Sequence, residues 1–287
     1  MRRLRGALTP YFLILPGGLW LIAFFAIPVI VLISISTQQG DIVNGFSQTF
    51  HFANYASAWD NYHDQFIRSI LYGGVATIAC IALAYPMAYW IAFKGGARKS
   101  TYLFLILLPF FVSFVLRTVS WQYFLADNGI ILGPLKSAGL LPQNFRILAT
   151  GTAVIGGLTY NYLPFMVLPI YVALERIDFR LVEAAQDLYA SRVLAFRKVV
   201  FPLSLPGMFA GVLLTFVPVV ADYVNAAILG GTQNTMIGNI IQDQFLTTQD
   251  YPTGAALSFM LMAMLLIGMF IYARALGTED VLEVAAR

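Results

Sequence analysis

The sequence has few charged residues for its length. Of its 287 residues, 11% are Asp, Glu, Lys or Arg, and 59% are hydrophobic. A soluble domain carries about 25% charged residues. So few charges cannot cover a water-facing surface, which excludes an ordinary soluble domain. The net charge of +3 therefore reflects membrane topology, and nucleic acid binding is not indicated.

Cysteine and histidine are also scarce. Cys80 is the only cysteine, which excludes an internal disulfide and a cysteine cluster for a metal. His51 and His63 lie in one predicted loop, and we interpret them as loop residues rather than metal ligands. No Ser, His and Asp set stands at membrane depth. The sequence therefore gives no support to a membrane enzyme.

The sequence contains long runs without any charged residue. The uncharged runs are 6–40, 69–93, 147–174, 199–221 and 251–273, and the run 100–126 is broken only by Arg117. About 20 apolar residues in a helix cross the hydrocarbon core. The runs predict an all-α polytopic protein with six transmembrane helices, at about 11–37, 66–93, 101–125, 148–174, 202–229 and 253–275. Continuous runs do not fit the alternating strands of a β-barrel.

The basic residues predict the orientation in the membrane. With both termini on one side, that side holds thirteen of them: Arg2, Arg3, Arg5, Lys94, Arg98, Lys99, Arg176, Arg180, Arg192, Arg197, Lys198, Arg274 and Arg287. The other side holds three, namely Arg68, Lys136 and Arg146. Cytoplasmic loops carry the excess of Lys and Arg. Both termini are therefore predicted to be cytoplasmic.

We expect one membrane domain, 1–287, with a core at about 66–275 and a long cytoplasmic loop at about 175–201. The first apolar run is too long for a cleaved signal peptide and is expected to be a retained helix. Gly207 and Gly211 form a GxxxG pattern, which permits close approach between helices. That approach fits packing within this chain or contact with a second subunit.

The stretch "VEAAQDLYASRVLAFRKVVFPLSLPG", 182–207, predicts two short amphipathic helices beside the membrane. The first apolar set has helical spacing and comprises Leu181, Ala184, Ala185 and Leu188, while Glu183 and Asp187 fall away from it. After a break near Ser191, the second set comprises Val193, Leu194 and Phe196. Pro202 and Pro206 are predicted to stop the surface helix and restart the chain. A docking surface, a solvated charge run and a membrane-surface anchor all fit this pattern.

The same stretch resembles the EAA loop of inner-membrane permease subunits of ATP-binding-cassette importers. The matching residues are Glu183, Ala184, Ala185, Phe196, Pro202, Pro206 and Gly207. Tyr189 stands where the family has glycine, which favours a left-handed turn. We therefore expect Tyr189 to avoid that turn and the bend to differ.

The resemblance implies a type I importer permease fold in a bacterial inner membrane and a set of partners. These are a second homologous permease, two cytoplasmic ATPase subunits and an extracytoplasmic substrate-binding protein. The ATPase would bind ATP and Mg²⁺ and contact Glu183, Ala184, Ala185, Asp187, Tyr189, Ser191, Phe196 and Pro202. This chain is expected to bind no cofactor and to hydrolyse no ATP. Its nearest phosphate-loop match, "GGARKST" at 95–101, lacks the required glycine spacing.

Two charges lie inside predicted membrane helices. Arg117 is in "FFVSFVLRTVSWQYF" and Asp222 is in "PVVADYVNAAILGG". An ionisable group in a span usually faces a cavity or a partner. The two residues fit an ion pair between helices, and Asp222 also fits a counter-charge for a cation on a translocation path. Trp121, Tyr160 and Tyr223 lie near them and fit a cation-binding surface or an interfacial aromatic belt.

Two further segments resemble spermidine/putrescine importer permeases, and most of all their first permease subunit. They are "LPFFVSFVLRTVSWQYFLADNGIIL" and "ADYVNAAILGGTQNTMIGNIIQDQF". The resemblance implies that the chain forms half of a path for a polyamine. A permease for iron or another small organic solute remains an alternative. A stand-alone secondary transporter would need two internal halves with broken helices, and the sequence has no such repeat.

Overall fold

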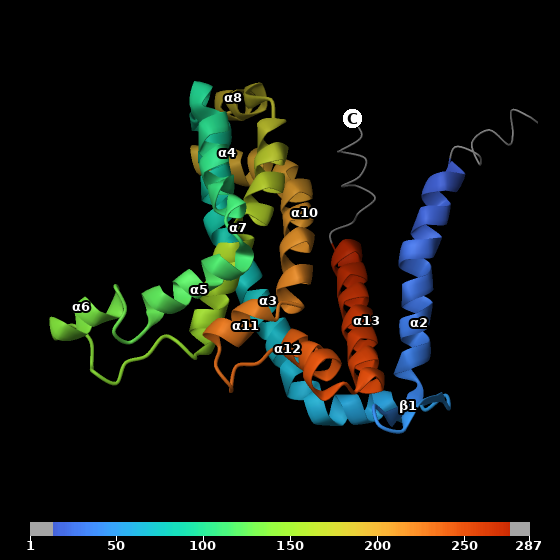
Figure 1. Ribbon diagram of the computed structural model, residues 1–287. Coiled ribbons are helices and arrows are strands. Elements are labelled where there is room, and N and C mark those ends of the chain that lie inside the picture. The colour runs from blue at the N-terminus through green and yellow to red at the C-terminus, as the bar shows by residue number, and fades with distance from the viewer. Residues whose placement is uncertain (1–13, 276–287) are drawn as a thin grey trace, which may run out of the picture. The chain divides into compact units, whose positions relative to one another are not determined.

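The computed structural model describes residues 14–275, and these residues are almost entirely helical (Figure 1). In chain order the elements are η1 Ile22–Ala26, α2 Ile27–Ser36, β1 Gln38–Asp41, β2 Gly45–Gln48, α3 Ala53–Lys94, η2 Gly96–Arg98, α4 Lys99–Leu107, η3 Leu108–Phe111, α5 Phe114–Leu125, α6 Leu132–Ser137, α7 Gly151–Glu175, α8 Phe179–Asp187, α9 Arg192–Ala195, η4 Phe196–Val200, α10 Phe201–Val220, α11 Val224–Leu229, α12 Ile237–Asp243, η5 Gln244–Thr248 and α13 Tyr251–Ala275.

Five helices within residues 14–275 are long and apolar enough to cross a membrane, and there are six if the bent pair Gly96–Phe111 and Phe114–Leu125 is one span. The prediction of an all-α polytopic protein is confirmed. The predicted cytoplasmic location of both termini concerns residues 1–13 and 276–287, which lie outside the described part of the chain.

The chain divides into two compact units. Unit 1 is Met1–His63 with Ile241–Met262, and unit 2 is Asp64–Ile240 with Ala263–Arg287. The single permease domain stays a prediction.

Unit 1 contains a two-stranded antiparallel hairpin after α2, in which Gln38 lies opposite Gln48. Asp41 closes the turn, because its Oδ1 accepts hydrogen bonds from the backbone N–H groups of Val43 and Asn44, both at 2.8 Å. These hydrogen bonds lower the pKa of the Asp41 carboxyl below its usual range, and the one from the Asn44 backbone has the largest effect. The hairpin was not predicted, because its polar and glycine residues read as a loop.

In unit 2, α7 and α10 lie side by side (Figure 1). Glycine makes this contact possible. A Cβ on Gly207 would lie 2.4 Å from the Ala173 Cβ and from the Pro169 carbonyl oxygen. One on Gly211 would lie 2.7 Å from the Met166 sulfur. The GxxxG pattern therefore packs inside this chain, which is one of the two roles that the sequence left open.

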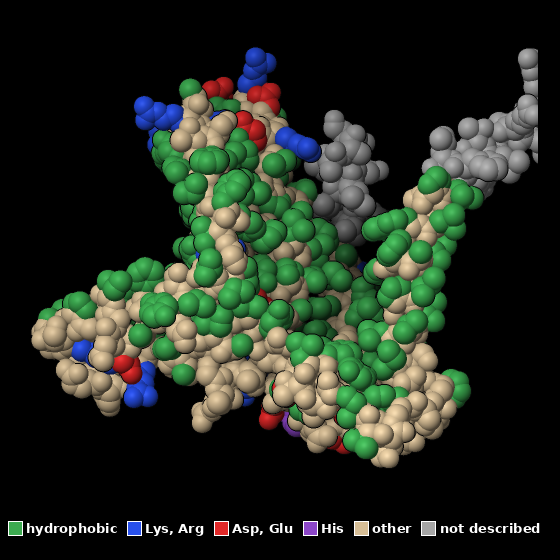
Figure 2. All heavy atoms as spheres, in the orientation of Figure 1, with side chains coloured by type: hydrophobic (Ala, Val, Ile, Leu, Met, Phe, Trp, Pro, Cys, Tyr) green, Lys and Arg blue, Asp and Glu red, His purple; other side chains and the backbone are tan. Residues whose placement is uncertain are grey.

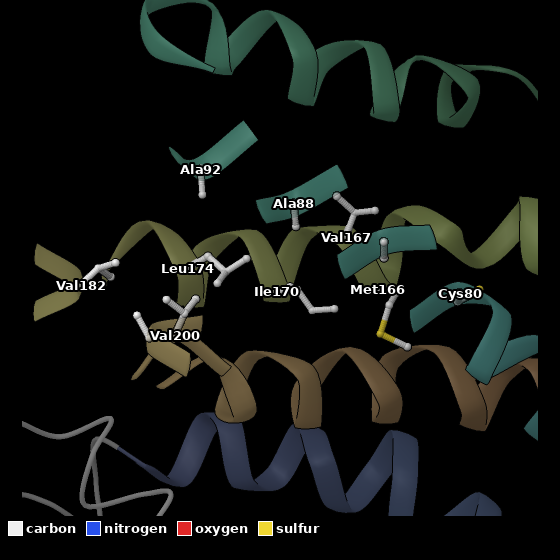
Figure 3. Close-up of a cluster of buried hydrophobic side chains, with 11 residues drawn as sticks. Cys80, Ala88, Ala92, Met166, Val167, Ile170, Leu174, Val182 and Val200 are labelled. Carbon is white, nitrogen blue, oxygen red and sulfur yellow. The ribbon is translucent and has the colours of Figure 1, made fainter. Parts of the chain in front are cut away.

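The larger core of unit 2 is built around an alanine-rich stripe of α3 (Figure 3). Cys80, Ala84, Ala88 and Ala92 recur every four residues and so lie on one face of the helix. They meet Met166, Val167, Ile170 and Leu174 of α7, and the same core includes Val182, Ala195 and Val200 of the following loop. The loop is thus packed onto the membrane helices rather than loosely attached to them.

Three predicted helix boundaries are wrong. The helix expected at 101–125 is broken after η3, and its two halves meet at an angle of 89°. Val112 and Ser113 have extended backbone conformations there, directly after the Pro109 turn. The helix expected at 202–229 ends at Val220, and α11 is separate. The second helix begins at Ala53 rather than near 66. An apolar run predicts only the part of a helix that lies in lipid, so the polar first turns were not predicted.

Candidate functional site

A buried polar cluster surrounds Asp222 in unit 2. It comprises Thr118 of α5, Asn161 and Tyr162 of α7, Asp222 after α10, and Asn225 of α11. The Tyr162 hydroxyl donates to Asp222 Oδ2 at 3.0 Å, and the Asn225 backbone and side-chain N–H groups donate to the carboxylate at 2.7 and 3.1 Å. All three donors are neutral. Asp222 is 6% exposed, so its carboxyl group is buried with no cationic partner among the described residues of this cluster.

Asn161 extends the cluster across α7. Its Nδ2 donates to Asn225 Oδ1 and to Thr118 Oγ1, both at 3.0 Å. Its Oδ1 is buried and accepts no hydrogen bond from the described residues. The cluster therefore ties α5, α7 and α11 together and keeps one further acceptor free.

Arg117 does not pair with Asp222. It is 8% exposed, and its Nε and Nη1 have no hydrogen-bond partner among the described residues. Its guanidinium carbon lies 5.1 Å from the Phe110 ring centroid and 5.6 Å from that of Phe114. The ion pair that the sequence left open is thus not formed, and neither group has an oppositely charged partner within residues 14–275.

Three residues predicted for the path do come together. Arg117, Trp121 and Tyr160 line one half-open pocket of about 520 Å³, in which the Trp121 and Tyr160 rings meet edge to face at 5.4 Å. Tyr223 does not line this pocket, and 44% of its surface is exposed. The backbone carbonyl of Tyr223 accepts a hydrogen bond from Asn239.

Sequence reasoning missed Thr118, Asn161 and Asn225. A signal for Asn161 was present, because a carboxamide in the uncharged run 147–174 is costly to bury in lipid without a partner. Asn225 follows Asp222 by three residues, a spacing at which side chains on a helical turn meet. Thr118 carried no signal of its own, because threonine hydroxyls commonly bond back to their own helix, as this one does to Phe114.

The second candidate region is the loop that contains α8 and α9, at the end of unit 2 where charged side chains gather (Figure 2). Asp178 caps α8 by accepting the Arg180 N–H at 3.0 Å, and Ser191 caps α9 by accepting the Leu194 N–H at 3.3 Å. The predicted first short helix and the break near Ser191 are therefore confirmed, whereas α9 is not a separate short helix, because it begins the continuous helical stretch Arg192–Val220.

Tyr189 does adopt the left-handed turn, and the expectation that it would avoid this turn is wrong. Its φ is 63°. The Tyr189 N–H donates to the Gln186 carbonyl at 2.9 Å, and the Ala190 N–H donates to the Ala185 carbonyl at 3.0 Å. This pair of bonds is a Schellman motif, which satisfies the last carbonyls of a helix and requires a left-handed residue. The hydrogen bonds outweigh the strain of a side chain at that position.

The apolar face predicted for α8 is also wrong in part. Val182 and Ala185 contact the core, whereas Leu181 and Leu188 are 49% and 81% exposed. The reason is that Val182 and Ala185 are three residues apart and share the face that meets α3 and α7. On the outer face, Glu183, Ala184, Asp187, Tyr189 and Ser191 are all exposed.

Phe196 holds this loop to the membrane helices. Its ring meets those of Tyr85 and Tyr89 of α3 edge to face, at 5.8 and 5.9 Å. Pro202 is exposed, and it does not stop the helix as predicted, because the helical chain is continuous over Arg192–Val220. The π-helical turn η4 ends at Val200, two residues before Pro202, and such a local adjustment accommodates the missing proline N–H.

The fold and these two regions define a class of membrane transport subunit. The chain belongs to the family described as "Binding-protein-dependent transport system inner membrane component", which it matches over residues 84–275. It is therefore a multi-pass permease subunit of an inner membrane and not an enzyme. The resemblance to importer permeases noted in the sequence is confirmed.

Two relatives of the chain have names that state a transported solute. The chain is 36% identical over 257 residues to the spermidine/putrescine transport system permease protein PotB of Haemophilus influenzae, covering 89% of this chain and 90% of that one. It is 35% identical to the PotB of Escherichia coli, covering 89% and 94%.

Solved structures share the fold at low identity. A bacterial ABC transporter that imports alginate aligns with a TM-score of 0.69 at 18% identity, covering 96% of this chain and 99% of that chain. The MetNI methionine ABC transporter aligns with a TM-score of 0.54 at 18% identity, covering 77% and 94%. These similarities support the importer permease fold and carry no information on the solute.

Proposed function

We propose that this chain is one of two transmembrane subunits of an ATP-driven importer whose solute is a polyamine such as spermidine or putrescine. The relatives that cover nine-tenths of the chain are named for spermidine and putrescine transport. The observation that carries the proposal is the buried carboxylate of Asp222, which is held only by neutral donors. A membrane-embedded charge marks a solute or ion pathway.

The polar cluster suits a linear polycation. Asp222 supplies a carboxylate that a bound ammonium group would keep ionised, and the free Oδ1 of Asn161 supplies a second acceptor. Trp121 and Tyr160 line the pocket of the positively charged Arg117, so we assign the cation site to Asp222 rather than to these rings. A protonated amine at Asp222 would take the place of the missing cationic partner.

The partner set follows from the proposal. A homologous second permease would enclose the path, a binding protein would deliver the solute, and two cytoplasmic ATPase subunits would supply ATP and Mg²⁺. The exposed outer face of α8, with Glu183, Ala184 and Asp187, is the surface that we assign to the ATPase. The exposed Tyr189 and Ser191 would border that surface, while Ala185, Phe196 and the continuous helix through Pro202 would transmit its movement. ATP binding would favour one orientation of the path, and hydrolysis would reset it.

Co-purification followed by reconstitution tests this function. The tagged chain is expressed with its native gene neighbourhood, extracted in mild detergent, and its associated chains are identified by mass spectrometry. We expect an ATPase and a second six-helix chain, and we expect proteoliposomes of the complex to take up labelled spermidine or putrescine with ATP. A complex that hydrolyses ATP but imports neither amine would reject the polyamine assignment and favour an iron or small organic solute. A chain that purifies alone would reopen the stand-alone transporter.

A further inference from the structure

Arg117 carries a buried charge that the described residues leave without an anion. Its side chain is 8% exposed, and its Nε and Nη1 make no hydrogen bond there. The faces of Phe110 and Phe114 compensate only part of the cost of removing the guanidinium from water. Because arginine stays protonated in proteins, the charge requires an anion that residues 14–275 do not supply.

The helix break beside Arg117 adds a second positive feature. Val112, at the 89° break, lines the same pocket as Arg117 and Ser120. The twelve-residue helix α5 begins two residues later, and the side chain of its capping residue, Ser113, makes no capping bond. The N-terminus of a helix carries partial positive charge. The guanidinium and the start of α5 therefore favour an anion in this pocket, which we name the Arg117 pocket.

The surroundings of the pocket indicate what kind of anion enters it. α5 exposes the apolar residues Val115, Leu116 and Tyr123, at 48%, 60% and 71%. On a membrane helix such apolar side chains face lipid or another helix, and an ionisable group in a span pairs with a partner group across the helix contact. A polyamine, being a cation, cannot supply the missing charge.

We propose that the Arg117 pocket receives an Asp or Glu side chain of the second permease subunit, so that α5 forms part of the interface between the two permeases. This inference rests on the proposed function, which supplies the second subunit. The guanidinium presents a planar fork that matches a carboxylate with two parallel hydrogen bonds. The incoming carboxylate would approach the guanidinium from the pocket that Arg117 lines and neutralise its charge. Asp222 would then remain free for the solute.

Two matched variants test the pocket in the co-expressed complex. Arg117→Met removes the charge and keeps much of the side-chain length. Arg146→Met makes the same change at an arginine whose side chain is 73% exposed. We expect Arg117→Met to weaken association with the second permease by about a hundredfold, the scale for removing one partner of a buried ion pair. Arg146→Met should leave association unchanged.

A charge-reversal screen locates the partner residue. Arg117→Glu should abolish polyamine uptake, and selection for restored growth on polyamine should return Asp→Lys or Glu→Arg changes in the second permease. If Arg117→Met associates normally but changes which solute is imported, the pocket binds solute and the proposal is overturned. Restoration only by changes in lipid composition would also overturn it, in favour of a lipid phosphate.

A labelling experiment keeps the inference testable if Arg117 variants fail to fold. Ser120 lines the pocket and is exposed in this chain, and Cys80 is the only native cysteine. In a Cys80→Ala background, Ser120→Cys should react with a water-soluble maleimide in the isolated chain and be protected in the complex. Equal labelling in both would contradict the interface. If the unaltered chain recruits no second permease at all, the proposed function fails before the pocket is tested.

Discussion

At the scale of single residues, Tyr189 is strained in order to close a helix. It holds φ at 63° while the carbonyls of Ala185 and Gln186 receive their hydrogen bonds. Its side chain is fully exposed, so no packing compensates for the left-handed conformation, which costs an L-residue roughly 1–2 kcal/mol. The strain is thus separable from any buried contact.

We predict that Tyr189→Gly stabilises the loop between α8 and α9. Glycine relieves the strain but loses about 0.5–1 kcal/mol in chain entropy, which leaves a net gain of roughly 0.5 kcal/mol. Slower amide hydrogen exchange at Ala190 and Ser191 would report this gain. Leu188→Gly is the control, because Leu188 has a φ of −85° and should exchange faster when replaced. Faster exchange in Tyr189→Gly as well would contradict the prediction.

Asp222 tests the path at the same scale. We predict that Asp222→Asn lowers polyamine uptake about tenfold or more, a loss of about 1.4 kcal/mol or more in transition-state stabilisation. The asparagine keeps the size of the side chain and loses its charge. Initial rates in reconstituted vesicles measure the effect.

Tyr162→Phe is the matched control for Asp222→Asn. It removes one hydrogen bond to Asp222 and keeps the charge, so its uptake should stay much closer to that of the unaltered protein. Equal uptake by Asp222→Asn and the unaltered protein would leave Asp222 with a structural role only.

The sequence predicted which charged residues lie in the membrane helices, but not which polar residues surround them. Asp222 and Arg117 stood out because charge is rare in an apolar run, and that signal needs no knowledge of the fold. Thr118, Asn161 and Asn225 meet only because the chain turns after Val220 and α5 crosses α7. Hydropathy reports the cost of transfer into lipid and contains no information on such crossings.

At the scale of elements, the apolar runs predicted α7 and α13 to within a few residues, at Gly151–Glu175 and Tyr251–Ala275. They could not predict the break at Val112, because an apolar residue in an extended conformation has the same hydropathy as one in a helix. The Schellman turn at Tyr189 was not predicted, because we considered only the cost of a left-handed conformation for tyrosine. The two hydrogen bonds that this conformation permits outweigh that cost.

The contact between α7 and α10 gives a prediction at this scale. Gly207→Ala places a methyl group 2.4 Å from the Pro169 carbonyl oxygen and from the Ala173 Cβ. Because both neighbours belong to packed helix, we expect a loss of roughly 1–3 kcal/mol in stability. Thermal unfolding of the isolated chain in detergent measures this loss.

Gly156→Ala is the control for the helix contact. Gly156 lies on α7, and a Cβ there meets nothing within 4 Å. Alanine should raise stability by about 0.5–1 kcal/mol through its helix preference. Equal effects of the two substitutions would mean that α7 and α10 do not pack through Gly207.

At the scale of the whole molecule, two buried ionisable groups lack a partner of opposite charge among residues 14–275. Asp222 is held by neutral donors and Arg117 by aromatic rings, whereas the buried Lys136 pairs with Asp127. The exposed outer face of α8 is connected through Val182, Ala185 and Phe196 to the same core that holds α7 and α10. A force applied at α8 therefore reaches the helices that carry the polar cluster.

Reversing one charge at α8 tests that connection in the assembled importer. Glu183 is exposed at the outer face of α8, so Glu183→Arg should leave the fold and the pairing with the second permease intact. We predict that it weakens the contact with the ATPase and lowers ATP-driven uptake at least about tenfold, the effect of placing a charge of the wrong sign in an interface. Uptake and ATP hydrolysis are measured on the same vesicles. Asp243→Arg makes the same reversal at an exposed residue of the predicted outer side and should leave hydrolysis coupled to uptake. Normal coupling in Glu183→Arg would remove α8 as the docking surface, whatever solute the importer carries.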